Sequence, residues 1–155
     1  MIQDPLSSAV AVALVFYRGR GDWMDRLIRL CTGSPYSHCE IRVGRVCFTS
    51  HQGRRGVTAM RRETFADWDA VPLPNVRPDD VLRFFRATHA DGYNWLGVLA
   101  AAFRVGYLPS GRWHCAQWCA AAIGADNPAR ITPGGLYRLV CPASSGATPF
   151  TTTAS

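Results

Sequence analysis

The first half of the chain consists of short apolar segments separated by turn residues, which is typical of a β-sheet. The longest of these segments, residues 9–17, is continuous and rich in valine, so it predicts a buried strand. Gly44-Arg45 predicts a tight turn between two later strands. We expect strands at residues 9–17, 37–43, 46–51, 56–61 and 70–73.

Helical periodicity dominates the second half, and one helix also interrupts the strands. That early helix has Asp22 as a candidate N-cap and Gly33 as a stop signal. Residues 95–103 are apolar on nearly all sides, which predicts a buried helix. We expect helices at residues 22–31, 79–90, 95–103, 114–123 and 132–137. A sheet followed by helices indicates the α+β class.

A chain of 155 residues with 48% hydrophobic residues is the size of a single domain. We assign residues 1–141 to this domain and expect residues 142–155, which are small and polar, to form a flexible tail. No apolar run reaches about 18 residues, so we expect no transmembrane segment. Asp4 and the lack of a basic region before the first apolar run argue against a signal peptide. We therefore expect the protein in the cytoplasm of the cell that makes it.

The formal net charge of +6 comes from 17 basic residues, all of them arginine. Guanidinium groups can bind phosphates or carboxylates through two hydrogen bonds, but the codon usage of a GC-rich genome explains an all-arginine set more simply. The arginines are scattered apart from the pairs Arg54-Arg55 and Arg61-Arg62, so nucleic-acid binding is not expected. The six cysteines form no CxxC pair, and we expect most of them to be reduced core residues.

Two segments contain residue types suited to chemistry. In the predicted strand that begins at residue 37, alternation places His38 and Glu40 on one face. A carboxylate beside a histidine fixes the histidine tautomer and stabilises its charged form, as a general base requires. Cys115 falls in the first turn of a predicted helix, where partial positive charge and free amide groups lower a thiol pKa and can bind an oxyanion.

Each of these segments alone is more typical of a structural role. A nucleophilic cysteine takes its base from a distant part of the chain, however, so the two segments together favour a Cys–His pair. Their spacing does not establish that they meet. His114, Cys115 and Cys119 lack a fourth ligand, so we expect no metal site.

Several motifs follow one another along the chain in a recognisable order: Tyr36-Ser37-His38-x-Glu40, Gly56-Val57, Trp68-Asp69 with Pro72-Leu73-Pro74, Tyr93-Asn94-Trp95-x-Gly97, and the helix that opens with Cys115. A chain with these motifs in this order resembles the circularly permuted NlpC/P60 hydrolases, which are papain-like cysteine hydrolases whose histidine-bearing strands precede the cysteine helix. The likeness spans about residues 10–140 and is to the YiiX/YaeF-like branch and its small phage-encoded members. It implies a permuted papain-like fold, with an antiparallel sheet or small barrel packed against helices.

The resemblance implies roles for the matching residues. Cys115 matches the nucleophile and His38 matches the base. Glu40 matches the acidic position of the family's Ser-His-x-Glu segment and shares the His38 face, so we rank it first as the residue that orients His38. Unpermuted relatives carry the orienting group on the next strand, which leaves His51 and Ser50 as alternatives.

One position departs from the family pattern. The family helix usually reads Cys-Ser-Glu, whereas this chain has Cys115-Ala116-Gln117, so a hydrogen-bonding side chain is kept and a charge is lost. Tryptophans flank Cys115 along the chain, which suggests that they form part of a substrate cleft. The expected cleft residues are Gln117, Trp113, Trp118 and Tyr36.

The implied activity is acyl transfer by a cysteine hydrolase of amide bonds, with no metal or organic cofactor. The expected substrates are peptidoglycan peptides, cut by a cell-wall endopeptidase or amidase that a phage virion could carry without an export signal. Other virion proteins are then candidate partners. The alternatives are a non-catalytic structural or binding component of a phage tail or neck, and an acyltransferase or lipid amidase.

Overall fold

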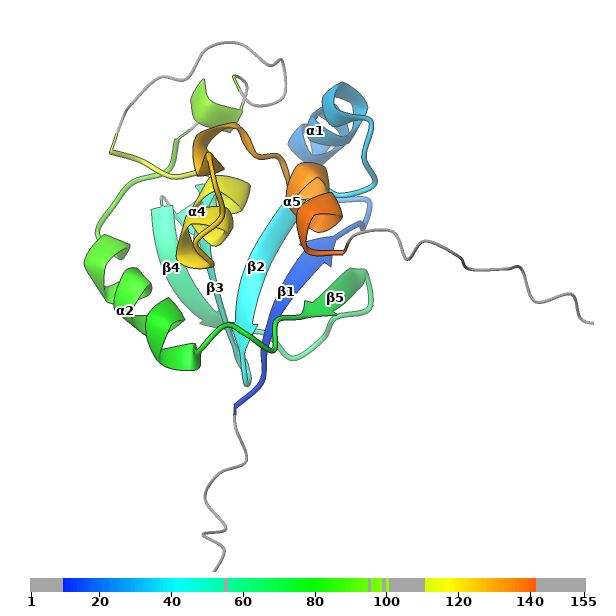
Figure 1. The fold of residues 1–155 in the computed structure, drawn as a ribbon. Helices are drawn as coiled ribbons and strands as arrows, with labels where there is room; N and C mark the ends of the chain where they lie inside the picture. The colour runs from blue at the N-terminus through cyan, green and yellow to red at the C-terminus, as the bar shows by residue number, and fades with distance from the viewer. Residues whose placement is uncertain (1–9, 55, 95, 99, 101–110, 142–155) are drawn as a thin grey trace, which may run out of the picture.

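The computed structural model describes residues 10–54, 56–94, 96–98, 100 and 111–141 (Figure 1). Strands occupy the first half of the described chain, and most of the helices follow them. The elements are β1 (Val12–Tyr17), α1 (Trp23–Thr32), β2 (His38–Val43), β3 (Val46–His51), the 3-10 turn η1 (Gln52–Arg54), β4 (Gly56–Arg61), β5 (Trp68–Pro72), α2 (Pro78–Thr88), α4 (Cys115–Ala122), the 3-10 turn η2 (Pro128–Arg130) and α5 (Pro133–Val140).

The strands form one antiparallel sheet in the order β4-β3-β2-β1-β5. Gly44 turns the chain between β2 and β3 with a φ of 59°, a left-handed conformation that favours glycine. The register places Val15 of β1 beside Glu40 of β2. Within the described residues, β4 and β5 are the two edges and do not pair with each other. The sheet is therefore open and is not a closed barrel.

One face of the sheet packs against the helices (Figure 1). Phe16 and Ile41 of the sheet join α4 in the main hydrophobic core. The α4 side chains that face the sheet are small, including Ala116 and Cys119, so the helix approaches closely, and the Cys119 thiol lies 3.7 Å from the Cys39 carbonyl oxygen. This packing fixes the start of α4 near the start of β2.

Residues 62–67 connect the two edge strands and contact the opposite face of the sheet. Arg62 in this connection binds the buried carboxylate of Glu40, and the Arg42 guanidinium lies 5.2 Å from the centre of the Phe65 ring. Because strand side chains alternate, Glu40 points away from the core that its neighbours Cys39 and Ile41 enter. The second face of the sheet therefore contains a buried charge.

Apart from the helix expected at 95–103, the predicted helices and strands are confirmed with small shifts in their ends. The α+β class is also confirmed, because an antiparallel sheet packs against helices. The last helix reaches Val140, three residues beyond the predicted end at residue 137. Much of the predicted helix at 95–103 lies outside the described residues, and Leu96 within it is 62% exposed, so the expected burial on all sides is wrong at that position. The predicted tail at 142–155 also lies outside the described residues.

Helix α1 begins at a capping box. An oxygen of Asp22 accepts hydrogen bonds from the amides of Met24 and Asp25 at 2.9 and 3.1 Å, and the Asp25 carboxylate accepts one from the Asp22 amide at 3.0 Å. These bonds satisfy amides that have no partner inside the helix. They also set the position of the helix end that borders the cleft described below.

Removing this cap is expected to destabilise the protein. We expect Asp22→Ala to lower the free energy of unfolding by about 1 kcal/mol, because the first-turn amides lose their acceptor. Asp126 is exposed and makes no side-chain hydrogen bond among the described residues, so Asp126→Ala is expected to change stability by less than about 0.5 kcal/mol. Denaturant titration of the two variants measures the difference, and equal effects would contradict the assigned cap.

Candidate active site

His38 and Cys115 line the same cleft, although one begins β2 and the other begins α4. The cleft has a volume of about 120 Å³. It lies between the start of α1, the start of β2, the end of β3 and Tyr93. Its lining residues are Asp22, Met24, Asp25, Ile28, Ser37, His38, His51, Gln52, Tyr93 and Cys115. Two segments that were predicted to contain chemistry are therefore brought together in space.

The start of α4 presents free amides beside the Cys115 side chain. His114 is the N-cap, and its Nδ1 accepts a hydrogen bond from the Gln117 amide at 3.3 Å. The amide of Trp118 donates to the His114 carbonyl oxygen at 2.9 Å, which is the first bond of the helix. The amides of Cys115 and Ala116 precede that bond and have no helical partner. They can bind an anionic oxygen that forms next to the thiol.

The Cys115 thiol is buried in surroundings that favour its ionised form. Hydrogen bonding with Cys39 lowers the pKa of the Cys115 thiol well below its usual value; burial acts in the opposite direction, and the charge of His38 adds to the lowering. Burial raises the pKa of Cys39, so that neighbour keeps its proton and can donate it. Cys39 therefore contributes to the lowered pKa of Cys115. The sequence does not predict this role, because strand alternation assigns Cys39 to the core.

His38 is correspondingly stabilised as an imidazolium. Burial lowers the pKa of His38, but the negative charge of Cys115 and hydrogen bonds to Cys115 and Glu40 outweigh it and raise the pKa to about 10. The Nε2 atom of His38 lies 3.3 Å from Oε1 of Glu40. This contact leaves Nδ1 as the nitrogen available to Cys115. Both pKa shifts act in the same direction, toward a Cys115 thiolate and a His38 imidazolium.

Glu40 is fully buried and is held by Arg62 as well as by His38. Arg62 donates from Nε to Oε2 at 3.1 Å and from Nη2 to Oε1 at 2.7 Å. Burial raises the pKa of Glu40, but the bonds to His38 and Arg62 outweigh it and lower the pKa to about 2. Arg62 was singled out in the sequence only as half of a basic pair, since nothing local signals a bond to a residue on another strand.

The two alternative orienting residues have other partners. The His51 ring lies edge-on to the His38 ring with 5.3 Å between their centres, and its Nδ1 accepts a hydrogen bond from the Gly53 amide at 3.0 Å. Ser50 donates its hydroxyl hydrogen to the Trp113 carbonyl oxygen at 2.7 Å. Ser50 thereby anchors the chain that leads into α4, whereas Glu40 is the one of these three residues that makes a hydrogen bond with His38.

Two of the residues expected in the cleft are tryptophans that lie elsewhere. Trp118 is fully buried, and its indole nitrogen donates to the Thr88 hydroxyl at 2.9 Å, so it belongs to the core between α2 and α4. Trp113 donates from its indole nitrogen to an oxygen of Asp91 at 2.8 Å and packs edge-on against Phe84. The expectation that these two rings line the cleft is corrected, because α2 supplies the surface on which both pack.

The other two expected cleft residues are buried. Tyr36 donates its hydroxyl hydrogen to Asp69 at 2.7 Å, and its ring packs between those of Phe16 and Tyr137. Gln117 is 5% exposed, and its Oε1 atom has no hydrogen-bond partner among the described residues. Neither is among the residues that line the cleft, so these expectations are also corrected.

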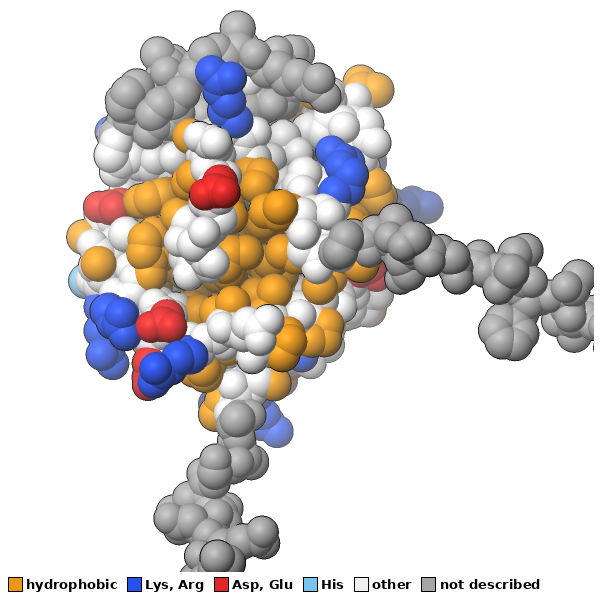
Figure 2. All heavy atoms as spheres, viewed as in Figure 1, with side chains coloured by type: hydrophobic (Ala, Val, Ile, Leu, Met, Phe, Trp, Pro, Cys, Tyr) orange, Lys and Arg blue, Asp and Glu red, His pale blue; other side chains and the backbone are white. Residues whose placement is uncertain are grey.

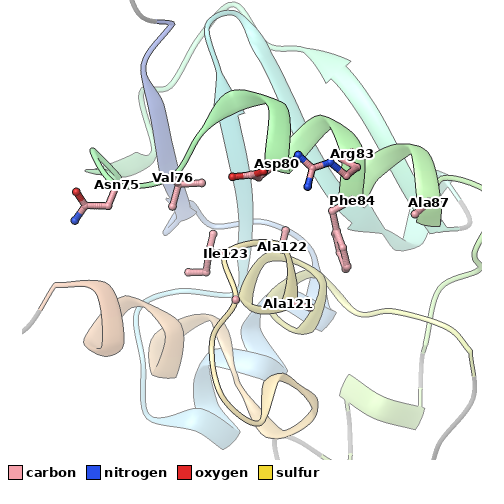
Figure 3. A pocket seen from close by; sticks show the side chains of 10 residues that line it. Asn75, Val76, Asp80, Arg83, Phe84, Ala87, Ala121, Ala122 and Ile123 are labelled. Atoms are coloured by element: carbon pink, nitrogen blue, oxygen red, sulfur yellow. Dashed lines mark hydrogen bonds and ion pairs between the residues drawn. The ribbon is translucent and has the colours of Figure 1, made fainter.

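A larger hollow of about 490 Å³ lies between α2 and the end of α4. Figure 3 shows Phe84 of α2 pointing toward Ala121 and Ala122 of α4, with Asp80 and Arg83 along the same helix. Figure 2 shows hydrophobic side chains gathered at the centre of this face. The described lining contains no cysteine and no histidine, and Asp80 pairs with Arg83 at 2.9 Å. The residues suited to catalysis are therefore in the smaller cleft.

The described side chains form no metal site, and similarity to known proteins does not identify a family. No group of three or more His, Cys, Asp or Glu side chains among the described residues is arranged to hold a metal ion. None of the helices in the described part of the chain has the length and apolar character to cross a bilayer. No protein-family model matches the sequence, and no curated protein matches it. The features that bear on function are therefore the geometry of the cleft and the sequence motifs.

Proposed function

We propose that this protein is a cysteine hydrolase in which Cys115 is the nucleophile, His38 is the general base and Glu40 orients His38. The observation that carries the proposal is the shared cleft, in which the pKa of the Cys115 thiol is lowered and that of His38 is raised to about 10. Perturbation of a cysteine and a histidine by each other is typical of a reactive thiolate pair. We further propose that the domain has the permuted papain-like fold, since the strand that bears His38 precedes the helix that bears Cys115.

The proposed reaction is acyl transfer through a thioester. The Cys115 thiolate attacks the carbonyl carbon of an amide, and the carbonyl oxygen becomes an oxyanion that the amides at the start of α4 bind. The His38 imidazolium donates its proton to the leaving amine as the carbon–nitrogen bond breaks. His38 then takes a proton from water, the resulting hydroxide attacks the thioester, and a carboxylic acid and the free thiolate are released.

Glu40 and Arg62 support this cycle through the position of His38. The Glu40 carboxylate holds Nε2 of the imidazole, so that Nδ1 is directed to the thiol. The two bonds from Arg62 fix the carboxylate in turn. Arg62 is therefore a positioning residue, since it acts on His38 through Glu40 and lies outside the cleft.

We propose peptidoglycan peptides as the substrates, on the basis of the resemblance to NlpC/P60 hydrolases. The net charge of +6 favours encounter with anionic wall polymers. Delivery by a phage virion would place the enzyme at the wall, with other virion proteins as partners. A lipid amidase or acyltransferase would use the same Cys–His pair, and product analysis distinguishes them from a peptide hydrolase.

Hydrolysis of purified stem peptides, followed by mass spectrometry of the products, tests the proposal. We expect Cys115→Ala to lower kcat/KM by about 10³-fold or more, because no other group supplies the thioester. Cys141 is exposed and free, so Cys141→Ala is the matched control and is expected to retain activity. Equal activity of the wild type and Cys115→Ala would exclude the mechanism. An inactive wild type with an unreactive Cys115 would support the non-catalytic phage component instead.

A further inference from the structure

Four arginines line another hollow, which has a volume of about 390 Å³. It lies at the end of β2 that is opposite to His38. Its residues differ entirely from those of the cleft. The lining consists of Arg42, Gly44, Arg45, Arg61, Arg62, Glu63 and Phe65. We call it the arginine pocket. Its volume falls in the range of pockets that bind small molecules, about 300–1,000 Å³.

Sheet pairing brings these arginines together from distant parts of the sequence. Arg45 lies in the turn between β2 and β3, and Arg61 ends β4, where it pairs with Val46 of β3. Arg42 comes from β2, and Arg62 begins the connection that crosses the sheet. The arrangement is therefore a consequence of strand register, and the basic pair at Arg61-Arg62 is half of it.

Carboxylates of the protein balance only part of the positive charge of the arginine pocket. Glu63 is the one carboxylate in the lining, against four guanidinium groups. Arg62 is engaged by Glu40, and Arg42 lies over the Phe65 ring. Arg45 and Arg61 are exposed and make no hydrogen bond or ion pair with any described residue. Four guanidinium groups thus face two carboxylates, and the excess of like charge favours the binding of an anion.

We propose that the arginine pocket binds a small ligand through a phosphate or diphosphate group. Guanidinium groups are planar and donate pairs of hydrogen bonds that match phosphate oxygens. Arg45 and Arg61 supply the free donors, while Arg42 and Arg62 are held in place by Phe65 and Glu40. The positive charge is concentrated in one compact hollow, which fits a small ligand better than the extended backbone of a nucleic acid.

Calorimetric titration with inorganic pyrophosphate tests this site. We expect the wild type to bind and Arg45→Gln/Arg61→Gln to bind at least tenfold more weakly, because the two unpaired guanidinium groups are lost. The control Arg26→Gln/Arg130→Gln removes two exposed arginines elsewhere, and both doubles have the same formal net charge, +6 − 2 = +4. All four positions are exposed, so thermal unfolding is expected to be unchanged in both variants.

The outcomes distinguish specific binding in the arginine pocket from a general attraction of anions to a basic protein. Tight binding that only the Arg45/Arg61 double loses supports the site. Ribose 5-phosphate and inorganic phosphate, which each carry one phosphate group, distinguish the source in parallel titrations: tighter binding of the sugar phosphate indicates a phosphorylated metabolite, and equal or weaker binding indicates an inorganic anion. Equal weakening in both doubles, or no binding of either probe to the wild type at millimolar concentration, would overturn the proposal.

Discussion

Alkylation of Cys115 by iodoacetamide at pH 6 is expected to become about ten- to a hundredfold slower when His38 is replaced by alanine. The thiolate is the reactive form, and an unperturbed thiol, with a pKa of about 8.5, is less than about 1% ionised at this pH. In the wild type the pKa of Cys115 is lowered, in part by the charge of His38, so the thiolate persists as the pH falls. Hydrogen bonding with Cys39 remains in His38→Ala and retains part of the lowering.

The rate of alkylation at Cys115, measured in His38→Ala and in His51→Ala, shows which of the two histidines in the cleft activates the thiol. His51 lines the same cleft, but its Nδ1 is bound to a backbone amide. His51→Ala is therefore expected to leave the rate at Cys115 within about threefold of the wild type. A larger loss in His51→Ala than in His38→Ala would show that the base has been assigned to the wrong histidine.

Replacing Arg62 by methionine is expected to lower the free energy of unfolding by about 3–5 kcal/mol at neutral pH. The Glu40 carboxylate is fully buried, and removal of Arg62 takes away two of its hydrogen bonds and the guanidinium charge that faces it. The neighbouring Arg61 is exposed and unpaired within the described structure, so Arg61→Met is expected to cost less than about 0.5 kcal/mol. Denaturant titration compares the two variants.

The pH dependence of this loss has a definite sign. The pKa of Glu40 is lowered from 4.5 to about 2 in the folded protein, so the ionised carboxylate contributes stability above pH 4.5 that is lost as the pH falls through 2. The difference between wild type and Arg62→Met should therefore be largest at neutral pH and shrink below about pH 4.5. The double variant Arg62→Met/Glu40→Leu is expected to recover most of the loss. A loss that is independent of pH, or absent in Arg62→Met, would contradict the buried pair.

Local patterns in the sequence were sufficient to predict the strands and most of the helices. Apolar runs bounded by turn residues specify strands through contacts between near neighbours, and Asp22 and Gly33 mark the ends of α1 through their own backbone chemistry. The same period of two residues placed Glu40 beside His38, and the structure has that contact at 3.3 Å. These features depend on residues that are close along the chain.

Features that depend on packing between elements could not be predicted in this way. Trp118 lies close to Cys115 in the sequence, but α4 is buried along residues 115–120, so no periodicity reveals which side faces a cleft. The bond from Arg62 to Glu40 forms because residues 62–67 cross the sheet from one edge to the other. This path of the chain cannot be predicted from local sequence patterns. The wall that α1 contributes to the cleft likewise follows from tertiary packing alone.

An ion pair between Cys115 and His38 in the resting protein underlies the proposed mechanism. An NMR titration of the His38 imidazole in the wild type and in Cys115→Ala tests directly whether this pair exists. We predict that His38 titrates near pH 10 in the wild type and that its pKa falls by more than about one unit in Cys115→Ala, because the thiolate charge is removed. A His38 that titrates near its ordinary value of 6.5 in both proteins would contradict the ion pair and the mechanism built on it.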